Sequence, residues 1–301
     1  MKKNAILLLV HHLPEQVNIF LDQILKGTTM DIYIHINKLL DDGVLRRQLL
    51  KDERIRISNN NVAISWGDDG IMRAYLQLMK EALESGIEYN YIMLGTGQDL
   101  IIRPGLDQYL NDQNNRIFIY GYQDNKERRS YVMHHWSPKY RRMMNFKLNP
   151  YKIIRRFRIE FFKLFQICEK KTKVDVSDWT FYYNDMWAAY PREVAKYLVD
   201  YWQNNGDFMS MFNDALVPEE AYFLTIIMRS KYSKWVFFDN EGKSNDLYRI
   251  RGIANGHPYI NTMKDIEDLN NSNLFFSRKF DIRKDKQVID YYYNKVVNLN
   301  I

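Results

Sequence analysis

The chain has 301 residues, of which 46% are hydrophobic, 15% aromatic and 27% charged. A chain of this length buries about 75% of the surface that it exposes when unfolded, and the low numbers of Gly (13) and Pro (7) exclude collagen-like and linker-like proteins. Its 43 Lys and Arg against 37 Asp and Glu give a net charge of +6. The one cysteine, Cys168, excludes an intrachain disulfide and a cysteine-ligated zinc site, so we expect a reducing compartment.

The basic excess is concentrated in one segment of the chain. Residues 139–173 contain twelve Lys or Arg and two acids, Glu160 and Glu169, whereas the remaining residues include 31 basic and 35 acidic ones. A slightly acidic remainder would repel the phosphates of a nucleic acid, so we predict no nucleic-acid partner. The segment 139–173 instead predicts a local contact with an anionic membrane surface or a solvated basic face.

The N-terminus imitates a signal peptide, but its apolar run, Ala5–Val10, has only six residues and ends at His11. This run is too short for a secretory signal and for a transmembrane helix, which needs about 20 residues. We therefore expect a cytoplasmic protein, with peripheral attachment to the inner face of the membrane as an option.

The first 125 residues alternate between short apolar runs and amphipathic segments. Pro14 opens a helix that ends near Gly27, and apolar residues at helical spacing predict a second helix over 71–83. The predicted strands are 5–10, 31–37, 54–57, 62–64, 91–94 and 116–120. Strands that alternate with helices predict an α/β fold with a mostly parallel sheet and right-handed crossovers.

The remaining residues are predicted to be mainly helical. The predicted helices are 151–167, 192–202, 218–228, 265–270 and 286–297, and the predicted strands are 235–238 and 247–251. We expect one domain, 1–301, with an α/β half at 1–125, a basic helical insertion at 126–180, and a second half at 181–301.

Polar residues follow three of the predicted strands. They are the pairs His11-His12, Asn37-Lys38 and Gln98-Asp99. In a parallel sheet, ligands bind at the carboxyl ends of the strands. The three pairs therefore predict a shared cleft at that edge.

The predicted helix at 151–167 is both apolar and basic. Its apolar side consists of Ile153, Ile154, Phe157, Phe161, Leu164 and Phe165, and its basic residues include Arg155, Arg156, Arg158 and Lys163. Such a helix either lies on anionic lipid or packs its apolar side against the protein and leaves its basic side in solvent. The sequence leaves both options open.

Several common site motifs are absent. The turn Gly95-Thr96-Gly97 lacks the Lys-Ser/Thr of a phosphate-binding loop and the third glycine of a dinucleotide site. The histidines have no carboxylate partner at ligand spacing, and the pairs Asp41-Asp42 and Asp68-Asp69 are typical of solvated turns. We predict no metal and no cofactor, so a bound diphosphate would need Arg or Lys as its counter-charge.

Short motifs then extend, in order, over nearly the whole chain. They are Leu9-Val10-His11-His12, 33–38 (Tyr-Ile-His-Ile-Asn-Lys), Ser65-Trp66-Gly67, 97–100 (Gly-Gln-Asp-Leu), Trp187, Val217-Pro218-Glu219-Glu220, His257-Pro258 and Arg278-Lys279-Phe280-Asp281. This ordered set resembles the core 2/I-branching β-1,6-N-acetylglucosaminyltransferase family, which includes the protein O-xylosyltransferases. The resemblance implies a GT-A-like fold, a nucleotide-sugar donor, inversion at the anomeric carbon and no metal requirement. It also implies that 1–125 is the nucleotide-binding half and 181–301 the acceptor and catalytic half.

The resemblance also implies roles for single residues. Glu220 would be the general base, and Lys279 would hold the donor diphosphate together with Arg249 or Arg251. The residues on the uridine side would be Leu9, Val10, His11, Asn37 and Lys38. Asp99 would either bind the sugar or cap the next turn, and Arg128 and Trp187 would lie on the acceptor side. The chain departs from the family pattern at three places: Asn37, where the family often has Asp, Asn184-Asp185 in place of Gly-Ser, and 247–251 (Leu-Tyr-Arg-Ile-Arg) in place of Leu-Arg-Tyr-Ile-Asp-Trp.

The expected function is transfer of N-acetylglucosamine from a UDP-sugar to a hydroxyl of a glycan or lipid-linked glycan, in bacterial surface polysaccharide or lipo-oligosaccharide synthesis. UDP-xylose and UDP-glucose are the alternative donors. A non-catalytic membrane-surface or nucleic-acid-binding protein is a different class of alternative. A hydrolase is disfavoured because the neighbouring Glu219 and Glu220 point apart on their helix and make a poor acid–base pair.

Overall fold

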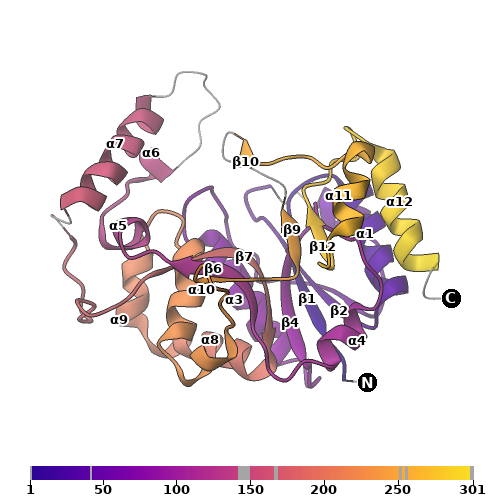
Figure 1. Cartoon of the computed structure of the whole chain (residues 1–301), viewed down its shortest axis with the longest axis horizontal. Helices are drawn as coiled ribbons and strands as arrows, with labels where there is room; N and C mark the ends of the chain where they lie inside the picture. Colours follow the sequence, from indigo (N-terminus) through magenta and orange to yellow (C-terminus); the bar gives the residue numbers. More distant parts are fainter. Residues whose placement is uncertain are drawn as a thin grey trace.

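We describe a computed structural model of the chain, which covers residues 2–40, 43–141, 150–165, 169–250, 253–254 and 257–298. Its centre is a seven-stranded sheet with the order β3-β2-β1-β4-β7-β6-β8 (Figure 1). The strands are β1 (Ala5–Val10), β2 (Asp31–Ile36), β3 (Ile55–Ile57), β4 (Tyr91–Thr96), β6 (Phe118–Gln123), β7 (Tyr182–Pro191) and β8 (Lys243–Ser244). The first four strands pair in parallel, whereas β7 pairs antiparallel with both β4 and β6.

The helices cover both faces of this sheet. They are α1 (Pro14–Gly27), α2 (Val44–Gln48), α3 (Gly70–Leu83), α4 (Leu106–Asn111), α5 (Glu127–Met133), α6 (Pro138–Arg141), α7 (Pro150–Phe165), α8 (Arg192–Asn204), α9 (Gly206–Met209), α10 (Glu219–Met228), α11 (Ile266–Asn271) and α12 (Lys286–Val297). Strand β6 runs in the direction of β1–β4, so five of the seven strands share one direction. The mixed α/β fold with a mostly parallel sheet is thus confirmed.

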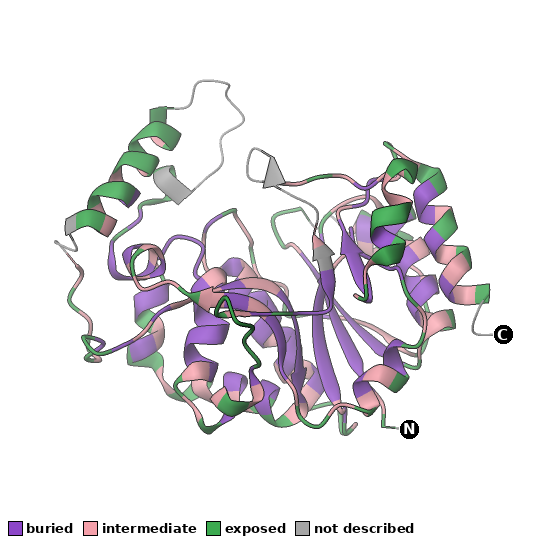
Figure 2. Cartoon of the chain, in the orientation of Figure 1, coloured by how far each residue is buried: buried purple, intermediate pink, exposed green. Residues whose placement is uncertain are grey.

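The alternation of side chains along β1 divides the core into two clusters. Ala5, Leu7 and Leu9 pack on the face that α3, α8 and α10 cover, whereas Ile6, Leu8 and Val10 pack on the face that α1 and α12 cover. All six residues are buried (Figure 2). A strand buried on both faces is apolar throughout, which explains why this run is so clear in the sequence.

A second, three-stranded sheet lies beside the first. Its order is β5 (Leu100–Ile101), β12 (Phe276–Arg278) and β9 (Tyr248–Ile250). Strand β12 pairs antiparallel with β5 and parallel with β9. The two remaining short strands, β10 (Ile253–Ala254) and β11 (His257–Pro258), pair with each other. This second sheet brings the end of β12 to the carboxyl end of β4.

Two predicted strands are wrong, and several observed strands were not predicted. Residues 62–64 form a loop, whose backbone is held by the side chains of His35 and Asn37 rather than by a neighbouring strand. Residues 231–235 form a 3-10 helix, and the predicted strand 235–238 is reduced to isolated bridges at Val236 and Phe238. The main unpredicted strand is the ten-residue β7, in the middle of the sheet. The other unpredicted strands are short: β5, β8, β10, β11 and β12.

The pairing of β6 with β7 depends on a glycine. The register shifts between Ile119 and Gly121, and a Cβ atom at Gly121 would lie 2.3 Å from the carbonyl oxygen of Tyr183. Only glycine permits this approach of the two backbones. The approach positions Asp185 and Trp187 on β7.

The helix α7 stands away from the sheet, as Figure 1 shows. Its inner side contributes Ile159 and Phe162 to a small core with Trp136, Leu216 and Val217. Within the described part of the chain, no helix is long and apolar enough to cross a membrane.

Candidate functional site

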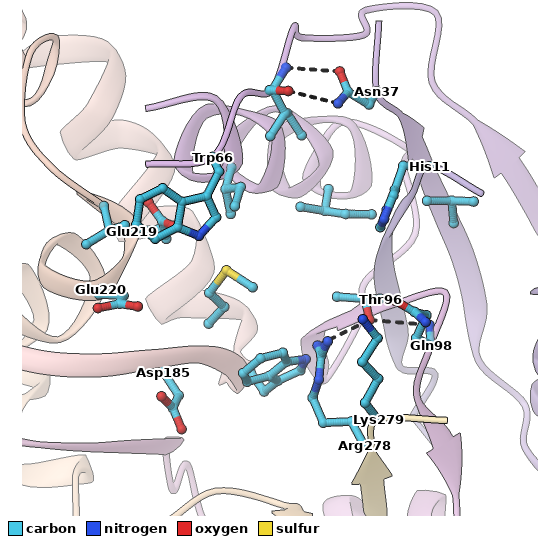
Figure 3. Close-up of a pocket in the computed structure, with 17 residues that line it drawn as sticks. His11, Asn37, Trp66, Thr96, Gln98, Asp185, Glu219, Glu220, Arg278 and Lys279 are labelled. Carbon is cyan, nitrogen blue, oxygen red and sulfur yellow. Dashed lines mark hydrogen bonds between the residues drawn. The ribbon is translucent and has the colours of Figure 1, made fainter. Parts of the chain in front are cut away.

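A pocket of about 480 Å³ opens at the carboxyl edge of the parallel strands (Figure 3). Its lining includes His11 after β1, Asn37 after β2, and Thr96 and Gln98 at the end of β4. The predicted meeting of three strand ends is therefore observed. The opposite side is formed by β7 and by the start of α10, with Trp66 at its edge.

Two cations at the end of β12 form one wall of this pocket, which we call the basic wall. They are Arg278 and Lys279, and Figure 3 shows both beside Thr96 and Gln98. Burial and the charge of Arg278 lower the pKa of the Lys279 ammonium. Lys279 makes no ion pair with any described residue, so the wall presents positive charge to an incoming anion.

Arg278 is held rigidly by its neighbours. Its Nη1 lies 3.4 Å from Asp99 Oδ1 and 3.3 Å from Thr96 Oγ1, and its guanidinium lies 4.0 Å from the centre of the Trp187 ring. Asp99 in turn accepts hydrogen bonds from the Thr96 backbone N–H (2.7 Å) and hydroxyl (2.9 Å). Asp99 is fully buried and does not line the pocket, so in this structure it caps the turn after β4 and orients Arg278.

Three carboxyl groups form the opposite wall, which we call the acidic wall. They are Asp185 on β7 and Glu219 and Glu220 in the first turn of α10, and Figure 3 shows them across the pocket from Arg278 and Lys279. The N-terminus of a helix stabilises negative charge, which favours carboxylates in the first turn. The pocket is thus positive on one side and negative on the other.

Glu220 is partly exposed and held in place by Arg128. The Arg128 Nη1 donates to Glu220 Oε2 at 2.6 Å, whereas Glu220 Oε1 accepts no hydrogen bond from a described residue. Loss of hydration raises the pKa of Glu220, the Arg128 guanidinium opposes that shift, and the charge of Asp185 adds to it. A carboxylate with one free oxygen and a raised pKa can accept a proton from a hydroxyl.

Arg128 does not line the pocket itself. Its side chain is buried between the rings of Tyr131 and Tyr183, with the carboxylates of Asp124 and Glu220 beside it. It therefore acts on the pocket through Glu220. Trp187, the other residue predicted on the acceptor side, does line the pocket and lies below Arg278.

The acidic wall contains two residues that the sequence did not assign. Glu219 is only 4% exposed, its Oε2 has no hydrogen-bond partner, and burial raises its pKa well above the ordinary value. Asp185 accepts a hydrogen bond from the Tyr183 hydroxyl, and burial raises its pKa as well. Glu219 could have been chosen from its place in the motif, whereas Asp185 has no local signal beyond its departure from the family pattern.

The basic wall contains one further residue that was not predicted. Arg278 lies next to Lys279 in the motif Arg278-Lys279-Phe280-Asp281, so that motif was the available signal. Trp66, also unassigned before, belongs to Ser65-Trp66-Gly67 and lines the opposite rim.

Four of the five residues predicted on the uridine side line the pocket. Leu9, Val10 and His11 line it, whereas Lys38 is exposed and lies outside the lining. Asn37 lines it too, but both polar atoms of its amide are used: Nδ2 donates to Ile64 O at 2.9 Å, and Oδ1 accepts from Ile64 N at 3.0 Å. A carboxylate could not make the first of these bonds, which explains why Asn stands here.

The two candidate arginines near residue 250 are not placed on the pocket. The backbone of Arg249 belongs to β9, but its side chain is not among those described. Arg251 lies outside the described residues. Among the described residues, no group of three or more His, Cys, Asp or Glu side chains could hold a metal ion.

Comparisons with solved structures give only distant likenesses. A 4-diphosphocytidyl-2C-methyl-D-erythritol synthase from Anaerococcus prevotii has 11% identity and a TM-score of 0.29, covering 67% of this chain and 76% of its own. A putative glucose-1-phosphate thymidylyltransferase from Bacillus anthracis has 13% identity and a TM-score of 0.28, and the match covers 65% of this chain and 74% of that one. The core-mannan synthase A from Aspergillus fumigatus, in its Mn/GDP form, has 9% identity and a TM-score of 0.33, and the match covers 75% of this chain and 69% of that one. Scores this low do not define a shared fold.

The sequence comparisons are more decisive. No curated protein matches the chain. The model of the Core-2/I-branching enzyme family, however, matches residues 31–245, which is more than two thirds of the chain and includes β7, Asp185 and both glutamates of α10. This chain belongs to the Core-2/I-branching enzyme family and is a glycosyltransferase.

Proposed function

We propose that the chain transfers N-acetylglucosamine from UDP-N-acetylglucosamine to a hydroxyl of a glycan, with inversion and without a metal ion. The observation that supports this proposal is the division of charge in the pocket, with Arg278 and Lys279 facing Asp185, Glu219 and Glu220. A diphosphate matches the basic wall, and a hydroxyl that must lose a proton matches the acidic wall. A single displacement at the anomeric carbon needs only these two functions, a site for the leaving diphosphate and a base for the attacking hydroxyl.

The reaction that we propose has one step. The acceptor oxygen attacks the anomeric carbon from the side of Glu220, while the bond from that carbon to the β-phosphate oxygen breaks. The acceptor proton passes to Glu220, and UDP leaves with the bonding electrons. Attack opposite the leaving group inverts the configuration at the anomeric carbon.

Each wall supplies one part of the rate enhancement. A positioned base contributes about 10²–10⁴-fold. Arg278 and Lys279 stabilise the negative charge that develops on the β-phosphate, and removal of one such donor typically costs about 10²–10³-fold. Because a diphosphate is already a good leaving group, no general acid is required. Metal independence is part of the proposal, since two fixed cations can supply the counter-charge.

The proposal extends to the alternative donors, the position of the uridine and the acceptor. UDP-xylose and UDP-glucose are the alternative donors, and the uridine would lie against Leu9, Val10 and His11. We propose a lipid-carried glycan of a bacterial surface polysaccharide or lipo-oligosaccharide as the acceptor. The support for it is α7, a basic helix with an exposed apolar side, which contacts Trp66 at the rim of the pocket.

The test is calorimetric titration of UDP in the presence of EDTA. We expect the wild type to bind UDP, and Lys279→Ala to bind it about 10- to 100-fold more weakly, the effect of one charge-assisted hydrogen bond. Lys286→Ala is the matched control, because this exposed lysine pairs with Asp290 on α12. Folded wild-type protein that binds no UDP would refute the donor. Binding that needs a divalent ion would refute metal independence alone.

A further inference from the structure

The outer side of α7 is an apolar surface that is left exposed in the described part of the chain. Phe157 is 76% exposed, Leu164 74% and Ile153 65%. Ile154 and Phe161 on the same side are also exposed, at 43% and 42%. Of the fourteen exposed large hydrophobic residues in the described part of the chain, five lie on this one helix. Figure 2 shows α7 as mostly exposed.

Helical spacing gathers these side chains into one stripe. Residues 153, 157 and 164 follow one another at intervals of four and seven, so they lie on one face at 3.6 residues per turn. Of the two options that the sequence left open, packing of this apolar face against the protein is not observed, because its side chains are exposed. The inward side consists of Ile159, which is 5% exposed, and Phe162.

The apolar stripe is bordered by positive charge. Lys152, Arg156 and Lys163 lie on the adjoining side of the helix by the same spacing. Over the whole of α7 there are five Lys or Arg and one acid, Glu160, which pairs with Arg156 at 3.1 Å and with Lys163 at 3.4 Å. An apolar stripe with a basic border matches a surface that is apolar inside and anionic outside.

We propose that α7 docks in the plane of an anionic membrane surface. Phe157, Leu164 and Ile153 would enter the boundary between headgroups and acyl chains, while Lys152 and Arg156 would meet anionic headgroups. Charge complementarity alone would also suit a nucleic acid, but a nucleic acid offers no apolar layer to the stripe. A helix of 16 residues lies on the membrane and does not cross it.

Docking through α7 would orient the pocket. The inward side of α7 packs against Leu216 and Val217, directly before the glutamates of α10, and the Arg155 guanidinium lies 4.8 Å from the centre of the Trp66 ring. Both Trp66 and Val217 line the pocket. The acidic wall would thus face an acceptor that is carried on the membrane. This last step rests on the proposed function, whereas the docking itself does not.

The experiment is sedimentation of the full chain with vesicles of phosphatidylcholine alone or mixed with phosphatidylglycerol. We expect wild-type protein to bind the anionic vesicles at least tenfold more strongly than the neutral ones, and to be released progressively by salt. Equal partition to both kinds of vesicle, or none to either, would overturn the proposal without the need for any variant.

Two variants then separate the stripe from its border. Phe157→Glu with Leu164→Glu is expected to weaken anionic-vesicle binding at least tenfold, and Lys152→Glu with Arg156→Glu to remove its salt dependence. Phe237→Glu is the matched control, because Phe237 is 55% exposed but lies outside α7. Wild-type vesicle binding by both double variants would refute the docking surface. So would a change of oligomeric state on gel filtration without vesicle binding, which would assign the stripe to a second copy.

The two proposals can fail separately. UDP binding in solution should be unchanged in all of these variants, and it also reports that they are folded. Vesicle binding without UDP binding would leave the docking surface and refute the donor. UDP binding without vesicle binding would leave the donor and refute the docking surface.

Discussion

The basic wall and the acidic wall of the pocket are built in different ways. Arg278 is fixed by Asp99 and stacked over Trp187, while Lys279 beside it has no acidic partner among the described residues. Across the pocket, the charge of Arg128 acts on Asp185, Glu219 and Glu220, and burial still raises the pKa of all three carboxyl groups. The basic wall is thus prepared for an anion that is not part of the protein, and the acidic wall for a proton.

The largest expected effect comes from the acidic wall. Glu220→Gln should lower kcat by about 10²–10⁴-fold, because the amide cannot accept the acceptor proton. UDP affinity should stay within twofold, since Glu220 lies across the pocket from the basic wall that would hold the diphosphate. Steady-state kinetics and calorimetry on the same preparation measure both. The control is Glu241→Gln, an exposed glutamate paired with Lys243. A fully active Glu220→Gln would remove this residue as the base.

The next largest effect comes from the basic wall. Arg278→Ala should weaken UDP binding and lower kcat by about 10²–10³-fold, because it removes a donor aimed at the leaving group. Asp99→Asn should act in the same direction but less, since Asp99 only orients Arg278. In a double-mutant cycle the two effects should not add. Additive effects would contradict that role for Asp99. Arg73→Ala, on the exposed side of α3, is the control.

A smaller effect concerns the pH dependence of activity, which should respond in opposite directions to the two charged neighbours of Glu220. Activity should fall on acidification through an apparent pKa above the ordinary value of a glutamate, because the base works only when deprotonated. Asp185→Asn removes a negative charge that raises this pKa, so the acid limb should move to lower pH. Arg128→Gln removes a positive charge that lowers it, so the limb should move to higher pH. Shifts of kcat/KM profiles in the same direction would contradict this assignment.

The smallest expected effect concerns the loop at 62–64, which Asn37 holds at the edge of the pocket. Asn37→Asp replaces the Nδ2 donor to Ile64 O by an oxygen, which should cost about 1 kcal/mol of the free energy of unfolding. Denaturant unfolding measures it. Asn114→Asp is the control, because that side chain is exposed and makes no hydrogen bond with a described residue. An equal loss in both variants would show that the effect comes from added charge.

The parts of the fold that could be predicted are those with strong local signals. The strand Ala5–Val10 and the helices Pro14–Gly27 and Lys286–Val297 were predicted at or within a residue of their observed ends. Strand β7 was not predicted, because Asn184 and Asp185 interrupt its apolar pattern. Its place between β4 and β6 depends on pairing with residues far away in the sequence. Residues 62–64 have the composition of a strand but no strand beside them to pair with.

For the candidate site, motifs indicated individual residues but not their relations. Glu220 and Lys279 followed from short motifs, and the structure brings both to one pocket. The partner of Glu220 is Arg128, 92 residues earlier, and the partner of Arg278 is Thr96, 182 residues earlier. Such pairs have no local signature.

The sequence by itself therefore determined the alternation of strands and helices, the family and the chemistry of single residues such as Glu220. Only the tertiary structure decided which charges face one another and which side of α7 is left exposed. The physical reason is the distance along the chain over which each interaction acts. Periodicity and capping act within about one turn or strand, whereas burial and ion pairing depend on which distant segments pack together. Ile159 and Phe157 are two residues apart in the same helix, yet one is buried and the other is the most exposed residue of the apolar stripe.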